Sequence, residues 1–294
     1  MVKLVPVKGE KVPEIGLGTY LITPDAFSEA IKIGYRIIDT SDDYDNETMI
    51  GDQLTKLYNE NIVSREDLFI QTKISDNQSS WANPLCGVYF WNNSPFMQRH
   101  AVEEVMKEKI HNSKKRLRTD YLDSVLLHFP YPDYFIEMWD VLCKIKNEEN
   151  IRYIGVSNFS ERHISSLSKN SSKPQINQTY FSPIGNRQSL CDYCNNEDIK
   201  LMTYSPLQDL HSGRLNMSII NSLANKYGKD PSQIVLRWNI ERGSIPCPKS
   251  NHPARLLSNF ESIYFNMDND DMNLISSQNY DYQYIPESKY CPGI

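Results

Sequence analysis

The sequence predicts a single (β/α)8 barrel, an α/β fold in which eight parallel strands alternate with helices. Eight short apolar runs rich in Ile, Val, Leu and Tyr each precede a longer segment of helical length. The chain has 294 residues, and a barrel of this kind needs roughly 250. No G-x-G-x-x-G pattern follows any run, which argues against an open dinucleotide-binding sheet. We find no linker and expect one domain over residues 1–294.

The predicted strands are Ile15 to Tyr20, Tyr35 to Thr40, Leu68 to Lys73, Ser124 to Phe129, Tyr153 to Asn158, Gln175 to Tyr180, Lys200 to Ser205 and Ser244 to Lys249. Helix starts are indicated at Thr23-Pro24 and Asp230-Pro231, where a capping residue precedes a proline at the first helical position. Ahead of the first strand, Lys3 to Pro13 predicts a β-hairpin that closes the floor of the barrel.

Composition narrows the classes of function. Lys and Arg total 31 against 37 Asp and Glu, a net charge of −6, so no global basic field attracts nucleic acid or an anionic membrane. The mean hydropathy is −0.54, no apolar run approaches the roughly 20 residues of a membrane span, and Met1 to Val7 is too short for a secretory signal. We expect a soluble, cytoplasmic monomer, with a homodimer as the alternative.

Six cysteines are spread along the chain without the density of a disulfide scaffold or the paired spacing of a zinc finger. Cys191 and Cys194 form a C-x-x-C within a polar stretch of helical character. We interpret them as unlinked thiols, the alternative being a redox-active pair or half of a metal site.

Polar residues stand where the second to eighth predicted strands end, the edge at which this fold builds its active site. They are Asp39 with Tyr44 just beyond, Lys73, His128, Ser157 with Asn158, Gln178, Tyr204 with Ser205, and Lys249 with Ser250. Each residue alone has a plain structural explanation, such as a cap or a solvated strand end. Packing does not require the whole set, so we predict that they share one pocket.

Four of these residues suggest proton chemistry. A Lys73 held against Asp39 at a dry barrel mouth would stay charged, and its charge would lower the pKa of a neighbouring Tyr44. Tyr44 is then a candidate proton donor. His128, on the adjacent strand, could hold a carbonyl oxygen between its ring and the tyrosine hydroxyl.

Seven stretches resemble, in order, the successive signatures of the aldo-keto reductase superfamily: GYRIIDTSDDYDNETMIG, LFIQTKI, DSVLLHFP, IGVSNFS, INQTYFSP, TYSPL and PCPKSNHPARLLSNF. The resemblance implies a barrel that binds NADP(H) without a Rossmann domain and reduces a small-molecule carbonyl compound by hydride transfer. Asp39, Tyr44, Lys73 and His128 match the catalytic tetrad. Tyr44 would be the general acid, tuned by Lys73 and Asp39.

The resemblance also implies a set of cofactor contacts. Ser157, Asn158 and Gln178 match residues that bind the nicotinamide carboxamide, and Tyr204 matches the aromatic that stacks on its ring. The remaining positions are Gly18, Thr19 and Tyr20 on the ribose side, Ser205 and Leu207 at the pyrophosphate, Lys249, Ser250, Asn251 and Arg255 at the 2′-phosphate, and Asn259 at the adenine, with Asp39 as a further cofactor contact. Two cations suit a phosphate monoester, so NADPH is expected over NADH.

Two segments depart from the family pattern. The segment 74–98 is longer than in typical members and carries five aromatics, among them Trp91, and the tail 279–294 is also aromatic. We expect Trp91, Phe129, Tyr20 and the tail tyrosines to wall a pocket for a bulky or aromatic carbonyl compound. The alternative is that these aromatics pack outside the barrel or in a dimer contact.

Two other functions remain open at this point. One is an NADP-binding redox sensor or structural barrel with little turnover. The other is a metal-dependent barrel hydrolase, suggested by Asp42, Asp43, Asp45 and Glu47. Only one His ends a strand, so a solvated acidic loop explains that cluster better, and we expect no metal.

Overall fold

The computed structural model describes residues 14–75, 102–131, 134–167 and 172–285. The predicted hairpin at Lys3 to Pro13, Trp91 and most of the segment 74–98 lie outside these ranges, as does the tail beyond residue 285. In the described part, no helix is long and apolar enough to span a membrane.

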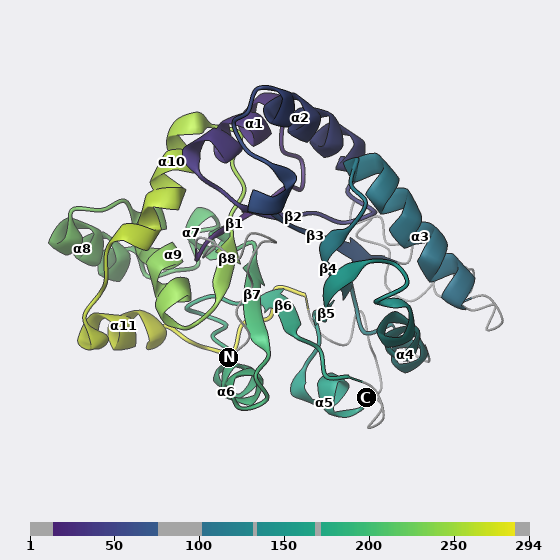
Figure 1. Cartoon of the computed structure of the whole chain (residues 1–294). Helices are drawn as coiled ribbons and strands as arrows, with labels where there is room; N and C mark the ends of the chain where they lie inside the picture. Colours follow the sequence, from purple (N-terminus) through teal and green to yellow (C-terminus); the bar gives the residue numbers. More distant parts are fainter. Residues whose placement is uncertain (1–13, 76–101, 132–133, 168–171, 286–294) are drawn as a thin grey trace.

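Eight parallel strands form one sheet in the order β1 to β8 (Figure 1). They are β1 Gly16–Gly18, β2 Ile37–Asp39, β3 Phe69–Ile74, β4 Leu122–Leu127, β5 Ile151–Ser157, β6 Ile176–Tyr180, β7 Lys200–Tyr204 and β8 Ile245–Cys247. Every predicted strand is confirmed, and β4 and β5 each begin two residues earlier than expected.

The barrel closes where β1 meets β8. The amide of Gly18 donates to the carbonyl of Pro248 at 3.0 Å. A Cβ on Gly18 would lie 2.7 Å from the backbone oxygen of Cys247. Glycine is therefore needed here, because only a residue without a side chain lets the two backbones approach this closely.

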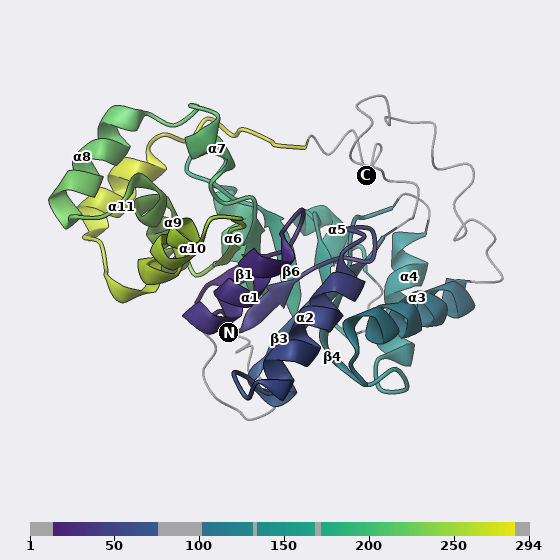
Figure 2. The ribbon, with the colours of Figure 1, turned by 90° about the horizontal axis from the view of Figure 1, so that it is seen from above.

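Helices surround the strands on the outside (Figure 1), and the view from above shows α8, α9, α10 and α11 gathered on one side (Figure 2). The helices are α1 Pro24–Ile33, α2 Glu47–Asn59, α3 Val102–Leu117, α4 Phe135–Ile145, α5 Glu161–Ser165, α6 Gln188–Asn196, α7 Gln208–His211, α8 Met217–Tyr227, α9 Pro231–Glu241, α10 Pro253–Phe260 and α11 Asn269–Ser276, with 3-10 turns η1 Arg65–Asp67 and η4 Glu261–Tyr264.

Both predicted helix starts are confirmed. The Thr23 hydroxyl accepts from the amide of Ala26 at the start of α1. Asp230 and Gln233 form a reciprocal capping box at the start of α9, with the amide of Asp230 donating to the Gln233 side chain at 2.9 Å. Each cap satisfies backbone donors that the first helical turn leaves without a partner.

Two apolar cores hold the barrel together. The larger one packs the helices against the outer face of the sheet. The smaller one consists of residues from the strands: Ile37, Phe69, Leu126, Ile176, Met202, Ile245 and Cys247. Since side chains alternate between the two faces of a strand, this smaller cluster fills the barrel interior. The polar residues at the strand ends therefore sit above an apolar plug.

The four cysteines in the described part, Cys143, Cys191, Cys194 and Cys247, are free thiols. Cys191 and Cys194 are buried on α6. Burial raises the pKa of both thiols above the ordinary value, to about 11 and about 12. A buried, protonated thiol is a poor nucleophile, and the interpretation of this C-x-x-C as unlinked thiols is confirmed.

Candidate active site

A cavity of about 420 Å³ opens at the carboxyl ends of the strands. Its described lining residues lie within or after every strand except β3, and in the tail. They are Gly18, Thr19, Tyr20, Asp39, Tyr44, His128, Ser157, Asn158, Gln178, Tyr204, Ser205, Cys247, Lys249, Tyr284 and Ile285. The structure thus brings most of the predicted strand-end residues to one pocket, because parallel strands all end on the same side of a barrel.

A buried ion pair lies beneath this cavity. The Lys73 ammonium donates to Asp39 Oδ1 at 2.8 Å and to the carbonyl of Thr40 at 2.9 Å. Asp39 Oδ1 also accepts from the Gln71 amide at 2.8 Å. Burial alone would lower the pKa of Lys73, but the Asp39 carboxylate raises that pKa above its ordinary value. Lys73 is therefore a fixed positive charge.

Tyr44 lies against this pair, with its ring centroid 5.1 Å from the Lys73 ammonium. Burial raises the pKa of Tyr44 to about 12, and Lys73 only partly offsets this rise. The expected lowering of the Tyr44 pKa is therefore wrong in its net direction, because desolvation of the phenolate outweighs the attraction of the nearby cation. Tyr44 remains protonated at neutral pH, as a proton donor must be.

His128 faces Tyr44 edge-on, with the ring centroids 6.1 Å apart. Burial lowers the pKa of His128 to about 4, although Asp43 opposes this shift. The ring is therefore neutral at neutral pH. Phe129 stacks on it at 4.8 Å and is itself buried, so it supports His128 and does not belong to the described cavity lining.

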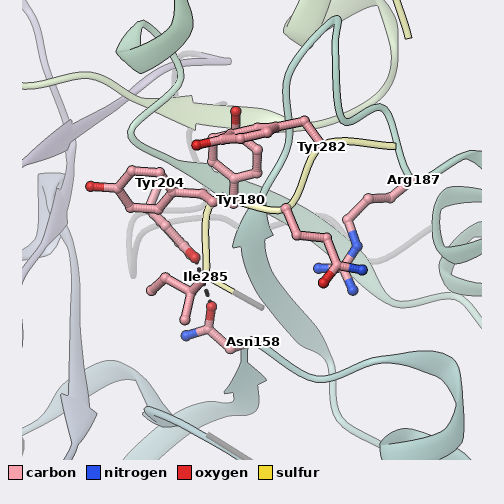
Figure 3. A pocket seen from close by; sticks show the side chains of 8 residues that line it. Asn158, Tyr180, Arg187, Tyr204, Tyr282 and Ile285 are labelled. Carbon is pink, nitrogen blue, oxygen red and sulfur yellow. Dashed lines mark hydrogen bonds between the residues drawn. The ribbon is translucent and has the colours of Figure 1, made fainter. Parts of the chain in front are cut away.

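A polar corner of the cavity lies at the ends of β5, β6 and β7. The Gln178 side chain is fully buried, and neither its amide nitrogen nor its oxygen has a partner in the described structure. The Tyr204 hydroxyl donates to Asn158 Oδ1 at 2.8 Å (Figure 3). Asn158 and Ser205 have positive φ values of 64° and 50°, which turn the chain sharply at the ends of β5 and β7.

The donor set of this corner fits a carboxamide ligand. A buried amide with both ends unpaired costs free energy. A ligand that offers one N–H and one carbonyl oxygen would satisfy both atoms of Gln178. The nicotinamide carboxamide has this pattern.

Two cations follow β8, and the first of them lies at the cavity. Lys249 lines it just after β8, and Arg255 lies in the first turn of α10; both are exposed, and neither side chain has a polar partner in the described ranges. Asn251 serves a structural purpose, because its side chain accepts from the amide of Thr23 at 3.0 Å and donates to the carbonyl of Leu21 at 3.1 Å. The other predicted cofactor residues Leu207, Ser250 and Asn259 are buried and are not among the described lining residues.

The tail crosses the mouth of the barrel. Tyr284 and Ile285 line the cavity, and Tyr284 stacks on Tyr180 with ring centroids 5.3 Å apart. Tyr204 and Tyr282 complete this aromatic group (Figure 3). The described part of the tail thus lies where substrate would enter.

The interpretation of the acidic cluster as a solvated loop is wrong for three of its four members, since the side chains of Asp42, Asp43 and Glu47 are at most 11% exposed and only Asp45 is exposed. Asp42 is buried against Lys109 at 2.9 Å, and Glu47 is buried against Arg116 at 2.7 Å. Burial raises the pKa of Asp42 to about 6, and Lys109 opposes the rise. Among the described residues, no group of three or more His, Cys, Asp or Glu could hold a metal ion.

Sequence reasoning missed several residues around the pocket. Cys247 lines the cavity from within β8, and Gln71 donates to Asp39 from two positions before Lys73. Ser41, two positions after the end of β2, and Ser75, directly after β3, both contact the His128 ring. The one signal that could have found them is strand alternation, which places Gln71 and Lys73 on the same face.

Comparison with known proteins agrees with this geometry. The model of the Aldo/keto reductase family matches residues 23–279. The chain belongs to this family. It is an aldo-keto reductase, an oxidoreductase on a (β/α)8 barrel.

Relatives of this aldo-keto reductase include a methylglyoxal reductase and a glyoxal reductase. Methylglyoxal reductase DkgA of Escherichia coli is 32% identical over 275 residues, which cover 91% of this chain and 90% of the relative. Glyoxal reductase of Bacillus subtilis is 33% identical over 279 residues, covering 93% and 91%. The crystal structure of a Bombyx mori aldo-keto reductase in complex with NADP superposes with a TM-score of 0.79 at 27% identity, covering 98% of this chain and 95% of the other.

Proposed function

We propose that this protein reduces an aldehyde or ketone with NADPH, with Tyr44 as the proton donor. The observation that supports this most is the meeting of three features in one cavity: Tyr44, the buried Lys73–Asp39 pair beneath it, and the unpaired amide of Gln178. Proton donor, charge and amide-binding corner are what carbonyl reduction by a nicotinamide cofactor requires.

The cofactor would be held along the length of the cavity. Gln178, Asn158 and Ser157 would bind the carboxamide, and Tyr204 would stack on the ring once its hydrogen bond to Asn158 opens. Lys249 and Arg255 are two exposed cations suited to the 2′-phosphate, which favours NADPH. When bound, NADPH supplies the hydride that reduces the carbonyl carbon.

Tyr44 would supply the proton. Its hydroxyl donates to the carbonyl oxygen as negative charge develops there, and Lys73 stabilises the phenolate that remains. Asp39 keeps Lys73 charged and in place. The high pKa of Tyr44 in the protein without substrate fits this order of events. The hydroxyl keeps its proton until negative charge on the carbonyl oxygen makes that oxygen a stronger base than the tyrosine.

The substrate side is proposed to accept bulky or aromatic carbonyl compounds as well as small ones. Tyr20, Tyr284 and Ile285 give the cavity an apolar rim, which suits an apolar or aromatic group on the substrate. The competing function is an NADP-binding protein with little turnover, and no feature of the described residues favours it.

The test is a turnover assay with a matched pair of variants. NADPH oxidation is followed by absorbance with methylglyoxal, aromatic aldehydes and ketones, and NADPH binding by fluorescence. Tyr44→Phe should lower turnover by roughly a hundredfold or more and leave NADPH binding intact. Tyr20→Phe removes a hydroxyl from the neighbouring ring, 5.2 Å away, and should keep most of the activity.

Two results would count against the proposal. Wild-type turnover in Tyr44→Phe would exclude this tyrosine as the proton donor. Tight NADPH binding by the wild type without turnover of any carbonyl compound would favour the sensor.

A further inference from the structure

The turn that carries Tyr20 connects β1 to α1. The amide of Ile22 donates to the carbonyl of Thr19 at 3.0 Å and closes this turn over Tyr20 and Leu21. Tyr20 lines the cavity, and its ring contacts the Tyr44 ring edge-on at a centroid distance of 5.2 Å. The conformation of the turn therefore decides whether an aromatic wall stands beside the proposed proton donor.

Leu21 has an unusual backbone conformation in this turn. Its φ is 56°, and a turn with a positive φ at its third residue favours Gly or Asn at that position. A leucine there costs free energy, because its Cβ lies too close to the following carbonyl oxygen. The Leu21 side chain is 66% exposed, so its packing offsets little of this cost. Other contacts must therefore hold the backbone in this conformation.

The side chain of Asn251 supplies two such contacts. Its Nδ2 donates to the carbonyl of Leu21 at 3.1 Å, and its Oδ1 accepts from the amide of Thr23 at 3.0 Å. One planar amide thus bonds to the backbone on both sides of Ile22 and fixes the direction in which the chain leaves the turn. Asn251 belongs to the segment after β8, 230 residues further along the chain than Leu21.

The first half of the turn is held by different contacts. Thr19 donates to the carbonyl of Asp39 through both its amide and its hydroxyl, at 3.1 and 2.9 Å. The Thr19 carbonyl also accepts from the Asn46 side chain at 2.7 Å. The side-chain bonds of Thr19 and Asn46 are buried, whereas those of Asn251 are exposed. Removing the Asn251 amide should therefore release the second half of the turn and leave the first half in place.

We propose that Asn251 is a positioning residue: it holds Leu21 in the left-handed conformation and so keeps the Tyr20 ring at the cavity, as a wall for an apolar or aromatic group of the substrate. This role differs from the 2′-phosphate contact that the family resemblance implies for Asn251. Both the nitrogen and the oxygen of its side-chain amide already bond to the backbone. The inference rests on the proposed function only for its kinetic consequence.

The conformation of the turn can be tested by urea unfolding, without any substrate. The difference in stability between Leu21→Gly and Leu21→Ala reports the sign of φ, because both variants remove the exposed side chain and only glycine adopts a positive φ without steric cost. With Asn251 present, the glycine variant should have the higher urea midpoint. In an Asn251→Ala background this advantage should shrink, since the alanine variant can then relax to a negative φ.

Two unfolding results would overturn the proposal. If the glycine variant has no advantage while Asn251 is present, Leu21 is not held at a positive φ. If its advantage is the same with and without the Asn251 amide, the turn keeps its conformation through other contacts.

Kinetics supply the second readout. Asn251→Ala should raise KM for aromatic aldehydes roughly two- to tenfold, the loss of one aromatic contact, and change kcat less, because Lys73 keeps its bond to Asp39. Adding Leu21→Gly should restore KM in part, and adding Leu21→Ala should not. A KM unchanged by Asn251→Ala, or equal KM values in the two double variants, would contradict the placing of Tyr20 by Asn251.

Fluorescence titration separates this role from a phosphate contact. Asn251→Ala should change the affinities for NADPH and NADH by the same factor, because the positioning role does not involve the 2′-phosphate. A loss confined to NADPH, with an unchanged KM for the carbonyl compound, would make Asn251 a phosphate ligand and overturn the proposal. Since unfolding tests the turn and Tyr44→Phe tests the reaction, this inference and the proposed function fail separately.

Discussion

The polar side chains at the carboxyl ends of the strands differ in whether they already form hydrogen bonds within the protein. Asn251 is engaged by Leu21 and Thr23, and the Tyr204 hydroxyl by Asn158. Gln178 and the two cations Lys249 and Arg255 are not engaged in this way within the described part of the chain. Polar groups that a fold leaves unsatisfied at a cavity are the ones most suited to bind a ligand.

Arg255 leads to a prediction about cofactor choice. Arg255→Ala should weaken NADPH binding roughly tenfold to a hundredfold and leave NADH binding nearly unchanged, because a guanidinium–phosphate contact is lost only with the phosphorylated cofactor. Fluorescence titration with both cofactors measures this. Arg118→Ala is the control, since Arg118 is an exposed arginine paired with Asp52 outside the cavity. Equal losses for the two cofactors would remove Arg255 from the 2′-phosphate site.

At the level of elements, the tail is fastened to the loop between β6 and α6. The amides of Tyr280 and Tyr282 both donate to the carbonyl of Ile184, at 3.2 and 3.0 Å. A Cβ on Gly185 would lie 2.3 Å from the backbone carbonyl oxygen of Tyr282, so the backbones of this loop and of the tail are in contact. The tail is thereby held where Tyr284 lines the cavity.

From the position of the tail we predict that substitutions in it change KM according to the size of the substrate. Tyr284→Ala should raise KM for bulky aromatic carbonyl compounds several-fold more than for methylglyoxal, because only a large substrate reaches the apolar rim. Tyr280→Ala, an exposed tyrosine of the same tail, should change neither KM. Trp91→Ala is the corresponding test for the segment 74–98. Parallel changes for large and small substrates would mean that the aromatics pack the tail and do not contact substrate.

At the scale of the whole molecule, closure of the barrel depends on the glycines of β1. A Cβ on Gly18 would meet the Cys247 backbone oxygen at 2.7 Å, whereas a Cβ on Gly16 would meet the Cys247 sulfur at 2.7 Å. The first neighbour cannot move without shifting β8, and the second belongs to a side chain that a substitution can remove.

Gly18→Ala should therefore destabilise the protein by about 1–3 kcal/mol, the usual cost of overpacking, as measured by urea unfolding. Gly16→Ala should also destabilise it, but its added cost should shrink in a Cys247→Ala background. The cost of Gly18→Ala should not shrink there. If Cys247→Ala reduces the destabilisation by Gly16→Ala and by Gly18→Ala equally, then the backbone of β8 is not what requires a glycine at position 18.

The sequence by itself determined the fold and the membership of the pocket. Apolar runs of strand length at regular spacing specify parallel strands, and parallel strands in a barrel bring their carboxyl ends together. Asp39, Lys73, His128 and Gln178 could therefore be placed at one mouth from their positions in the chain alone. The caps of α1 and α9 are local features of the same kind, whereas the need for glycine in β1 comes from its contact with Cys247 of β8.

Only the tertiary structure decided how these residues behave. The net rise of the Tyr44 pKa depends on burial, which no local pattern contains. Asp42 and Glu47 are paired with Lys109 and Arg116 of α3, 67 and 69 residues further along the chain. His128 likewise has a hydrogen-bond partner, Ser75, that lies 53 residues before it in the chain. Charge and desolvation act through space over a few ångströms, so their sign is fixed only when the fold brings distant residues together.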